Sequence, residues 1–232
     1  MYGDVIRKCY FLITSCWVLY QFIWKVDFPH FDRHSYSLIK FRTKKRHSKK
    51  RGFMSVEFEY LEKITQEFFS KARIQQSLNI IYEHDITGWE IWLQIELSHF
   101  LSKHDSEPEW HREEEHDYDR RMEKNKSFLK PDFLIRKKGW RKDSYFALEI
   151  KQHREAANCI SNMKKDMARV EKIKQSSVDL RNYWVLGVYE RKSKADIKEL
   201  ITDALDLHGY EYDDNVVVNK FINNTYFGYC IF

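Results

Sequence analysis

Cysteine, glycine and proline are all scarce in this chain of 232 residues. The four cysteines, at positions 9, 16, 159 and 230, are scattered and include no Cys-x-x-Cys pair. This argues against a disulfide framework and against a structural zinc site, and it is typical of a protein of the reducing cytoplasm. Seven glycines and three prolines exclude collagen-like and proline-rich disordered architectures.

Motifs of several common enzyme classes are also missing. The sequence has no Gly-x-Gly-x-x-Gly or P-loop motif, no serine elbow and no His-Glu-x-x-His pattern. The first two absences argue against nucleotide-driven motors and dinucleotide-dependent enzymes, and without the last pattern the histidines are interpreted as separate surface residues. What the chain does have is apolar material, since 43% of its residues are hydrophobic and 16% aromatic, which is enough for a sizeable core.

Charge divides the chain into a basic head and a mildly acidic body. Residues 1–53 contain 12 Lys or Arg against three Asp, a net charge of +9, whereas residues 54–232 contain 28 against 32, a net charge of −4. The total of +5 therefore comes from the head. Net basicity gives no support for nucleic-acid binding by the body, which would have to use local basic clusters and a metal.

The N-terminal extension, residues 1–53, combines an apolar run at 9–24 with a basic tract at 43–52. The run is shorter than the roughly 20 residues that span a bilayer. Three interpretations remain open: a membrane anchor that leaves the rest of the protein in the cytoplasm, an over-extended start with translation beginning at Met54, or an ordered accessory segment. A cleaved signal peptide is disfavoured because no small-x-small site follows the run.

From residue 54 onward, hydrophobic periodicity predicts an α/β domain with a mixed central sheet flanked by helices. Helices are expected at 54–77, 88–102 (with Thr87 as N-cap), 154–175 and 194–207. Buried strands are expected at 132–136, 145–150 and 183–189, the first two joined by a hairpin turn at Gly139. Short strands at 216–218 and 226–231 and an edge strand at 110–118 complete the prediction.

Two carboxylates and a lysine lie on the two strands of that hairpin. Asp132 follows Pro131 at the start of one strand, and Glu149-Ile150-Lys151 ends the next, with sixteen residues between Asp132 and Glu149. Because side chains alternate across a strand, Glu149 and Lys151 point to the same face. Charged groups at the end of an apolar strand are costly without partners, and two acids beside a lysine suit a hard divalent cation and its waters.

This pattern resembles the PD-(D/E)XK nuclease superfamily, whose members share the restriction-endonuclease-like fold. The resemblance covers roughly residues 87–189, because a helix precedes the hairpin and a helix and a strand follow it. It implies that Asp132 and Glu149 bind Mg²⁺, with Mn²⁺ as an alternative, and that Lys151 assists catalysis. It also implies a contribution from the polar Gln152, and it leaves a homodimer open, since many members act as dimers.

Many such nucleases take a further acid from the preceding helix, for which this chain has two candidates. Glu96 follows Trp89, Trp92 and Leu93 on the apolar side of the predicted helix, whereas Glu90 lies on a different face. A carboxylate on a buried stripe needs a partner. We therefore expect Glu96 to be the third catalytic and metal-binding acid and keep Glu90 in reserve.

Two basic clusters are candidates for contacts with a phosphate backbone. One lies in the hairpin turn and the other on the helix after the motif; they comprise Arg136, Lys137, Lys138, Arg141 and Lys142, and Lys164, Lys165 and Arg169. The alternative is ordinary solvated surface, with Asp166 stabilised by Arg169. The acidic segment 107–119 would repel a phosphate backbone and is expected either to face away from it or to regulate access to the site.

The leading hypothesis is thus a Mg²⁺-dependent nuclease that hydrolyses phosphodiester bonds of nucleic acid, with DNA as the expected substrate. The alternative is a catalytically inactive protein of the same fold that binds nucleic acid or a protein partner. A third interpretation is a membrane-anchored interaction protein in which the run at 9–24 matters most.

Overall fold

A computed structural model describes residues 55–117, 128–142, 144–170, 180–207 and 209–232. These residues all lie in one compact unit, Arg51–Phe232. The extension 1–53, with its apolar run and basic tract, falls outside the described residues. Among the helices that are described, none is both long and apolar enough to cross a bilayer.

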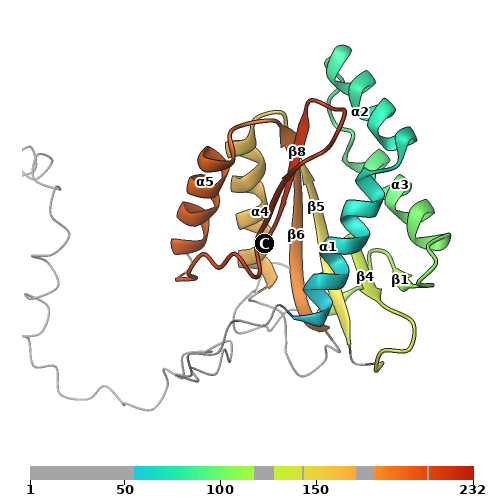
Figure 1. The fold of residues 1–232 in the computed structure, drawn as a ribbon. Coiled ribbons are helices and arrows are strands. Elements are labelled where there is room, and N and C mark those ends of the chain that lie inside the picture. The colour runs from blue at the N-terminus through green and yellow to red at the C-terminus, as the bar shows by residue number, and fades with distance from the viewer. Residues whose placement is uncertain (1–54, 118–127, 143, 171–179, 208) are drawn as a thin grey trace, which may run out of the picture. The chain divides into compact units, whose positions relative to one another are not determined.

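A six-stranded mixed sheet forms the centre of the described unit (Figure 1). Its strand order is β1-β4-β5-β6-β8-β7, with β5 and β6 parallel and the other neighbours antiparallel. The strands are β1 (Glu109–His111), β4 (Phe133–Arg136), β5 (Tyr145–Gln152), β6 (Leu180–Glu190), β7 (Val218–Phe221) and β8 (Phe227–Ile231). The predicted mixed α/β class is therefore confirmed.

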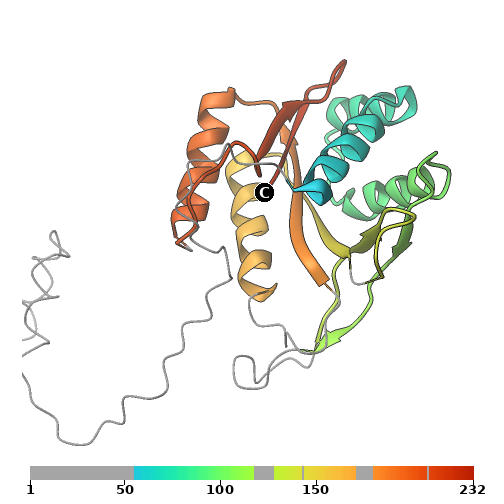
Figure 2. The same ribbon diagram turned by 60° about the horizontal axis from the view of Figure 1, so that its bottom comes forward.

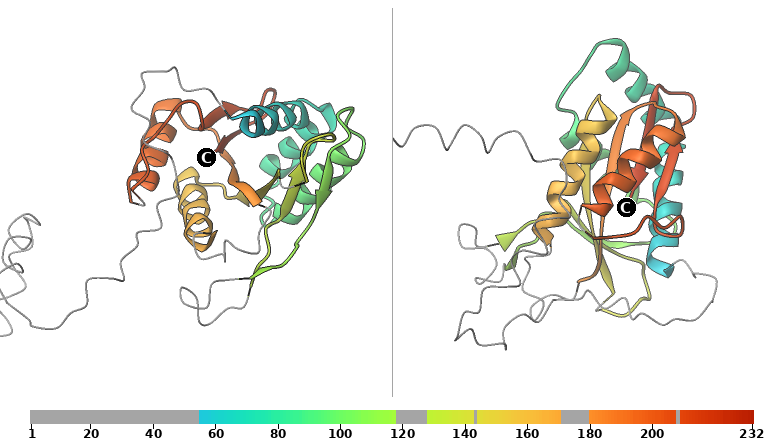
Figure 3. Two further views of the ribbon diagram at one scale, coloured as in Figure 1. Left: turned by 90° about the horizontal axis from the view of Figure 1, so that it is seen from below. Right: turned by 90° about the vertical axis from the view of Figure 1, so that its left-hand side faces the viewer.

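Two groups of helices cover opposite faces of the sheet (Figures 2 and 3). One group comprises α1 (Val56–Phe69), α2 (Ala72–Glu83) and α3 (Glu90–Ser102); the other comprises α4 (Ala156–Val170) and α5 (Lys194–Asp206). Side chains alternate along β5, so Phe146, Leu148 and Ile150 enter the core under α1–α3. Glu149 and Lys151 alternate with these residues and therefore lie on the opposite face, where Lys151 meets Asp166 of α4.

The predicted helix at 54–77 is in fact two helices. Ser55 caps α1, its Oγ accepting a hydrogen bond from Phe58 N, and the helix ends where Ser70 Oγ donates to Glu67 O. Lys71 is extended, with φ −68° and ψ 124°, and α2 then starts in a new direction. A serine that bonds to the backbone competes with helix continuation, which hydrophobic periodicity alone does not reveal.

The helix α3 begins later than predicted. Its N-cap position is Trp89 rather than Thr87, and no side chain caps it. Gly88 takes a left-handed conformation, with φ +70°, so the chain turns there before the helix starts at Glu90. As a result Glu90 lies in the first turn of α3.

The predicted hairpin is confirmed, with Leu134 opposite Ala147 and a turn closed by Trp140 N donating to Lys137 O. The expected edge strand at 110–118 is present as β1, which pairs with β4. The second half of that segment instead forms β2 (His116–Asp117), which pairs with β3 (Phe128–Leu129) in a separate two-stranded sheet. The predicted helix at 154–175 is present as α4 up to residue 170, and its expected end at 171–175 lies outside the described residues. The other predicted strands and helices are present with boundaries shifted by a few residues.

The helix α4 packs very closely on β6. A Cβ at Gly187 would lie 2.3 Å from Met163 Sδ and 3.1 Å from Cys159 Sγ, so only glycine leaves room for these side chains. Both Met163 and Cys159 are fully buried. This close approach brings the inner face of α4 to the face of the sheet that carries Glu149 and Lys151.

Candidate functional site

The start of β4 and the end of β5 place Asp132 beside Glu149. Phe133 pairs with Leu148 in the antiparallel ladder. Asp132, just before β4, therefore lies opposite Glu149 on β5. The two carboxylates are fixed reciprocally: Asp132 Oδ2 accepts from Ile150 N at 2.7 Å, and Asp132 N donates to Glu149 Oε2 at 3.3 Å. Each side chain is therefore held by the backbone of the neighbouring strand.

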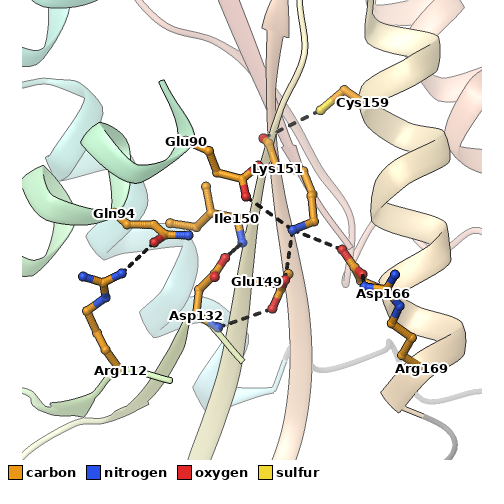
Figure 4. Close-up of polar contacts among 10 residues, drawn as sticks. All are labelled: Glu90, Gln94, Arg112, Asp132, Glu149, Ile150, Lys151, Cys159, Asp166 and Arg169. Carbon is orange, nitrogen blue, oxygen red and sulfur yellow. Dashed lines mark hydrogen bonds and ion pairs between the residues drawn. The ribbon is translucent and has the colours of Figure 1, made fainter. Parts of the chain in front are cut away.

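Lys151 lies among three carboxylates from three different elements (Figure 4). Its ammonium is 2.9 Å from Glu149 Oε1, 3.2 Å from Asp166 Oδ2 and 3.6 Å from Glu90 Oε1. Glu149 shares β5 with the lysine, Asp166 comes from α4, and Glu90 comes from the first turn of α3. Side chains from β5, from α3 on one side of the sheet and from α4 on the other side thus meet at one ammonium group.

Asp166 contributes a charge that we expected on a solvated helix face. It is only 3% exposed and points from the inner face of α4 toward Lys151. Its other oxygen, Oδ1, accepts from Arg169 Nη1 at 2.6 Å. The predicted Asp166–Arg169 pair is therefore present, but it belongs to the candidate site rather than to the solvent-facing side of the helix.

Burial and mutual repulsion destabilise the ionised form of the two motif acids. Desolvation, with a further contribution from the neighbouring Glu149, raises the pKa of Asp132 to about 7. Burial also raises the pKa of Glu149, although the Lys151 ammonium opposes that shift. Burial alone would lower the pKa of Lys151, but the carboxylates of Glu149, Asp166 and Glu90 outweigh it and hold that pKa above its usual value.

The donor set fits a hard divalent cation. When all are ionised, the four carboxylates of Asp132, Glu149, Glu90 and Asp166 exceed the two cations, Lys151 and Arg169, by two negative charges. A divalent cation would balance that excess, and its preferred ligands are carboxylate oxygens. Within the described part of the chain, no three acidic, histidine or cysteine side chains are grouped as ligands of a metal ion. Those of Glu149, Asp166 and Glu90 are directed at Lys151 instead, and that of Asp132 accepts from Ile150 N.

The structure does not bring Glu96 to this cluster. Glu96 is buried, as its position on the apolar side of the helix predicted, but its Oε1 accepts from Arg73 Nη2 of α2 at 2.6 Å. It lines a separate pocket of about 290 Å³ among α1, α2 and α3. The reserve candidate, Glu90, is the acid of α3 that reaches Lys151.

Gln152 also lies away from the cluster. It follows Lys151 on β5 and therefore faces the opposite side of the sheet. There it lines a small pocket of about 50 Å³ with residues that include Tyr82, Trp89 and Arg154. The contribution to the site that the resemblance implied has no counterpart in this geometry.

Arg112 is a neighbour of the site that the sequence did not single out (Figure 4). It follows β1, its guanidinium lies over the ring of Phe133, and its Nη2 donates to Oε1 of the buried Gln94 at 2.7 Å. Its Nε is buried without a partner among the residues described. A single arginine inside an acidic segment has no spacing that would identify it in advance.

Two of the five residues in the basic cluster of the hairpin turn, Arg136 and Lys138, are paired with the acidic segment. Arg136 is buried and bonds to Glu109 and to the carbonyl of Trp140, while Lys138 bonds to Glu107. Arg136 therefore cannot serve as the exposed phosphate contact that we expected. Glu107 and Glu109 of the acidic segment face this turn, and these pairs account for their charges.

The other residues of the two basic clusters have more varied surroundings. Lys137 lies over the ring of Tyr60, and Lys142 is exposed, as is Arg141. On α4, Lys165 is exposed and bonds to Asn162, and Lys164 is half-buried. Arg169 is half exposed but is committed to Asp166.

No protein-family model, curated protein or solved structure matched this chain when it was compared with each of these groups. A functional assignment of this chain therefore rests on the geometry of its described residues.

Proposed function

We propose that this chain is a Mg²⁺-dependent nuclease that hydrolyses phosphodiester bonds, with DNA as its substrate. The observation that carries the proposal is the meeting of Asp132, Glu149 and Lys151 at the ends of two buried, paired strands. Acids from α3 and α4 join them there. A non-catalytic hairpin has no need for three carboxylates around one partly buried lysine, with a fourth, that of Asp132, bonded to the adjacent backbone.

The order of elements supports a restriction-endonuclease-like fold for the central part of the chain. The helix α3 precedes β1, β4 and β5, and α4 then leads to β6, which lies parallel to β5. This is the arrangement that the resemblance requires: a helix, a hairpin carrying the motif, then a helix and a strand. The proposal places the site on the face of β5 next to α4.

In this proposal Asp132 and Glu149 hold the metal ion, with Glu90 as a further ligand. When bound, Mg²⁺ lowers the pKa of a coordinated water and polarises the phosphoryl oxygens. Lys151 supplies a fixed positive charge beside Glu149, where it stabilises the negative charge that develops on phosphorus oxygens. The raised pKa of Lys151 keeps its ammonium protonated at neutral pH.

A cleavage assay on the full-length chain tests the proposal. Supercoiled plasmid and labelled single-stranded DNA and RNA are incubated with Mg²⁺, with Mn²⁺ or with EDTA. We expect metal-dependent cleavage that falls at least about 100-fold in Asp132→Asn and in Lys151→Met. Asp203→Asn, on the exposed side of α5, is the matched control and should cleave at the wild-type rate.

Cleavage that survives both site variants would show that these residues are not the active site. Absence of cleavage under all conditions, together with metal-independent DNA binding, would instead favour the catalytically inactive alternative. Calorimetric titration with Mn²⁺ separates the two, because an active protein should bind the metal in a manner that depends on Asp132.

A further inference from the structure

Asp166 lies outside the motif, yet its position is as strongly constrained as those of the motif residues. It is on α4 three residues after Met163, whose side chain packs against Gly187 of β6. A nearly buried carboxylate is costly unless it is paired and hydrogen-bonded. Asp166 meets that requirement with two cationic partners, Lys151, whose side chain is 18% exposed, and Arg169, which is half exposed.

The two oxygens of Asp166 are divided between these partners. Oδ2 is 3.2 Å from Lys151 Nζ, and Oδ1 accepts from Arg169 Nη1 at 2.6 Å. Arg169 is on the same helix, three residues later, and so holds the carboxylate from its outer side. The inner oxygen is thereby kept on Lys151.

Lys151 depends on this arrangement because its nearest partner has a second role. Glu149 Oε1 is 2.9 Å from the ammonium, but Glu149 is also a proposed metal ligand. A carboxylate that turns toward a cation weakens its bond to a neighbouring ammonium. Of the two remaining partners, Glu90 is more distant and its side chain is 31% exposed, whereas that of Asp166 is closer and 5% exposed.

We propose that Asp166, fixed by Arg169, is the residue that holds the Lys151 ammonium in place when Glu149 is withdrawn from it. Asp166 is then a positioning residue that acts through Lys151, and not a metal ligand. The inference rests on the proposed function, because that function is what withdraws Glu149. The hold of Asp166 on Lys151 is nevertheless measurable without metal or substrate.

The test uses nuclear magnetic resonance of lysine ammonium groups in the metal-free, full-length chain. Glu149→Gln imitates the loss of the Glu149 charge, and Lys151→Met identifies the Lys151 signal. We expect the signal in Glu149→Gln and in the control Glu149→Gln/Asp203→Asn, and its loss in Glu149→Gln/Asp166→Asn. A signal that persists in the last variant, or that is already lost in Glu149→Gln, overturns the proposal.

A milder variant keeps the test valid if the double variant does not fold. Arg169→Gln retains the Asp166 carboxylate but removes its outer partner, and the Arg169 side chain is 49% exposed. We expect exchange of the Lys151 ammonium protons with water to become several-fold faster. Unchanged exchange would contradict the role of Arg169 and with it the proposed arrangement.

Kinetics separate this inference from the proposed function. With Mg²⁺ and DNA, Asp166→Asn should lower kcat by about 10–100-fold and leave KM and the calorimetric Kd for Mg²⁺ within about threefold. A tenfold weaker Kd would make Asp166 a ligand and overturn the inference. If the wild-type chain cleaves nothing while the ammonium signals behave as expected, the proposed function fails and the hold of Asp166 on Lys151 is upheld.

Discussion

At the scale of single residues, Lys151 is surrounded by more negative charge than one ammonium needs. Glu149, Asp166 and Glu90 all lie within ion-pair distance of it, and Asp132 is bonded to the backbone of the adjacent Ile150. A partly buried lysine in a stable structural ion pair requires one carboxylate and satisfied hydrogen bonds. The excess of acids is what a site for an additional cation would show.

The two acids of α3 give the sharpest test of which residues form the site. Glu90 is 3.6 Å from Lys151, whereas Glu96 is bonded to Arg73 on α2. We expect Glu90→Gln to lower the rate of metal-dependent DNA cleavage by about 10–100-fold, because it removes a carboxylate from the cluster. Glu96→Gln should stay within about threefold of the wild-type rate, measured in the same assay.

Thermal unfolding serves as the control for this pair of variants. Glu96 is the more deeply buried of the two, so its substitution should cause the larger drop in Tm even though it spares activity. The opposite pattern of rates, with Glu96→Gln the slower variant, would show that Glu96 is the third acid of the site, as expected from the sequence.

At the scale of helices and strands, apolar runs in the sequence predicted β4, β5 and β6. Because β4 and β5 were expected to form a hairpin, the sequence also predicted that Asp132, Glu149 and Lys151 lie close together. Apolar runs could not show whether Glu90 or Glu96 of α3 joins these residues. The helix is apolar on several sides, with Ile91 and Ile95 exposed, so its sequence does not show which face meets the sheet. The start of the helix at Glu90 depends on the turn at Gly88 and on tertiary packing.

Asp166 could have been identified from the sequence with the reasoning that was applied to Glu96. It lies one turn after Met163 and directly before Met167, on the edge of the apolar stripe of α4. An acid at such a position needs a partner inside the fold. Arg169, three residues later, offered a simpler partner for Asp166. The sequence therefore predicted the Asp166–Arg169 pair and gave no indication of the Asp166–Lys151 pair.

The hairpin between β4 and β5 contains two basic residues with different surroundings, the buried Arg136 and the exposed Lys142. Arg136 bonds to Glu109 of β1 and to Trp140 O, and so ties the turn to the edge of the sheet. Arg136→Gln should therefore lower Tm and leave the affinity for a DNA duplex unchanged. Lys142→Gln, at an exposed position, should leave Tm unchanged and weaken DNA binding modestly, with a smaller dependence on salt.

Thermal unfolding and fluorescence anisotropy with a labelled duplex at several salt concentrations measure these two effects. Both variants lose one positive charge, so each is the control for the other. If Arg136→Gln weakens DNA binding as strongly as Lys142→Gln without a change in Tm, the turn acts as a basic patch rather than as a structural tie.

At the scale of the whole molecule, the charge of the body has to be judged by position rather than as a sum. Residues 54–232 carry a net charge of −4, and part of their acidity pairs with basic residues of the same fold, as at Glu115 and Lys130. The negative charge at the end of β5 remains in excess. This excess costs stability in the absence of a cation, and the cost should depend on pH.

Stability in metal-free buffer should fall as pH rises between about 4 and 7. The pKa of Asp132 is raised from 3.8 to about 7 in the folded protein, chiefly by burial, so the native state keeps a proton that the unfolded chain has released. Below pH 4 both states hold the proton and no cost arises; above pH 7 the full cost is expressed. Asp132→Asn, whose amide oxygen can still accept from Ile150 N, removes this cost.

We therefore expect the Tm of Asp132→Asn to be close to that of the wild-type chain near pH 4 and to exceed it increasingly up to pH 8. The gain there is at most about 4 kcal/mol, because the pKa of Asp132 is raised from 3.8 to about 7. Asp203→Asn is the control and should show no such trend. Mg²⁺ should raise the Tm of the wild-type chain at pH 8 but not that of Asp132→Asn, because only the former offers the charge that binding neutralises. A difference in Tm that is the same at every pH would mean that ionisation of Asp132 imposes no cost on the fold, and that the site lacks the strain a cation would relieve.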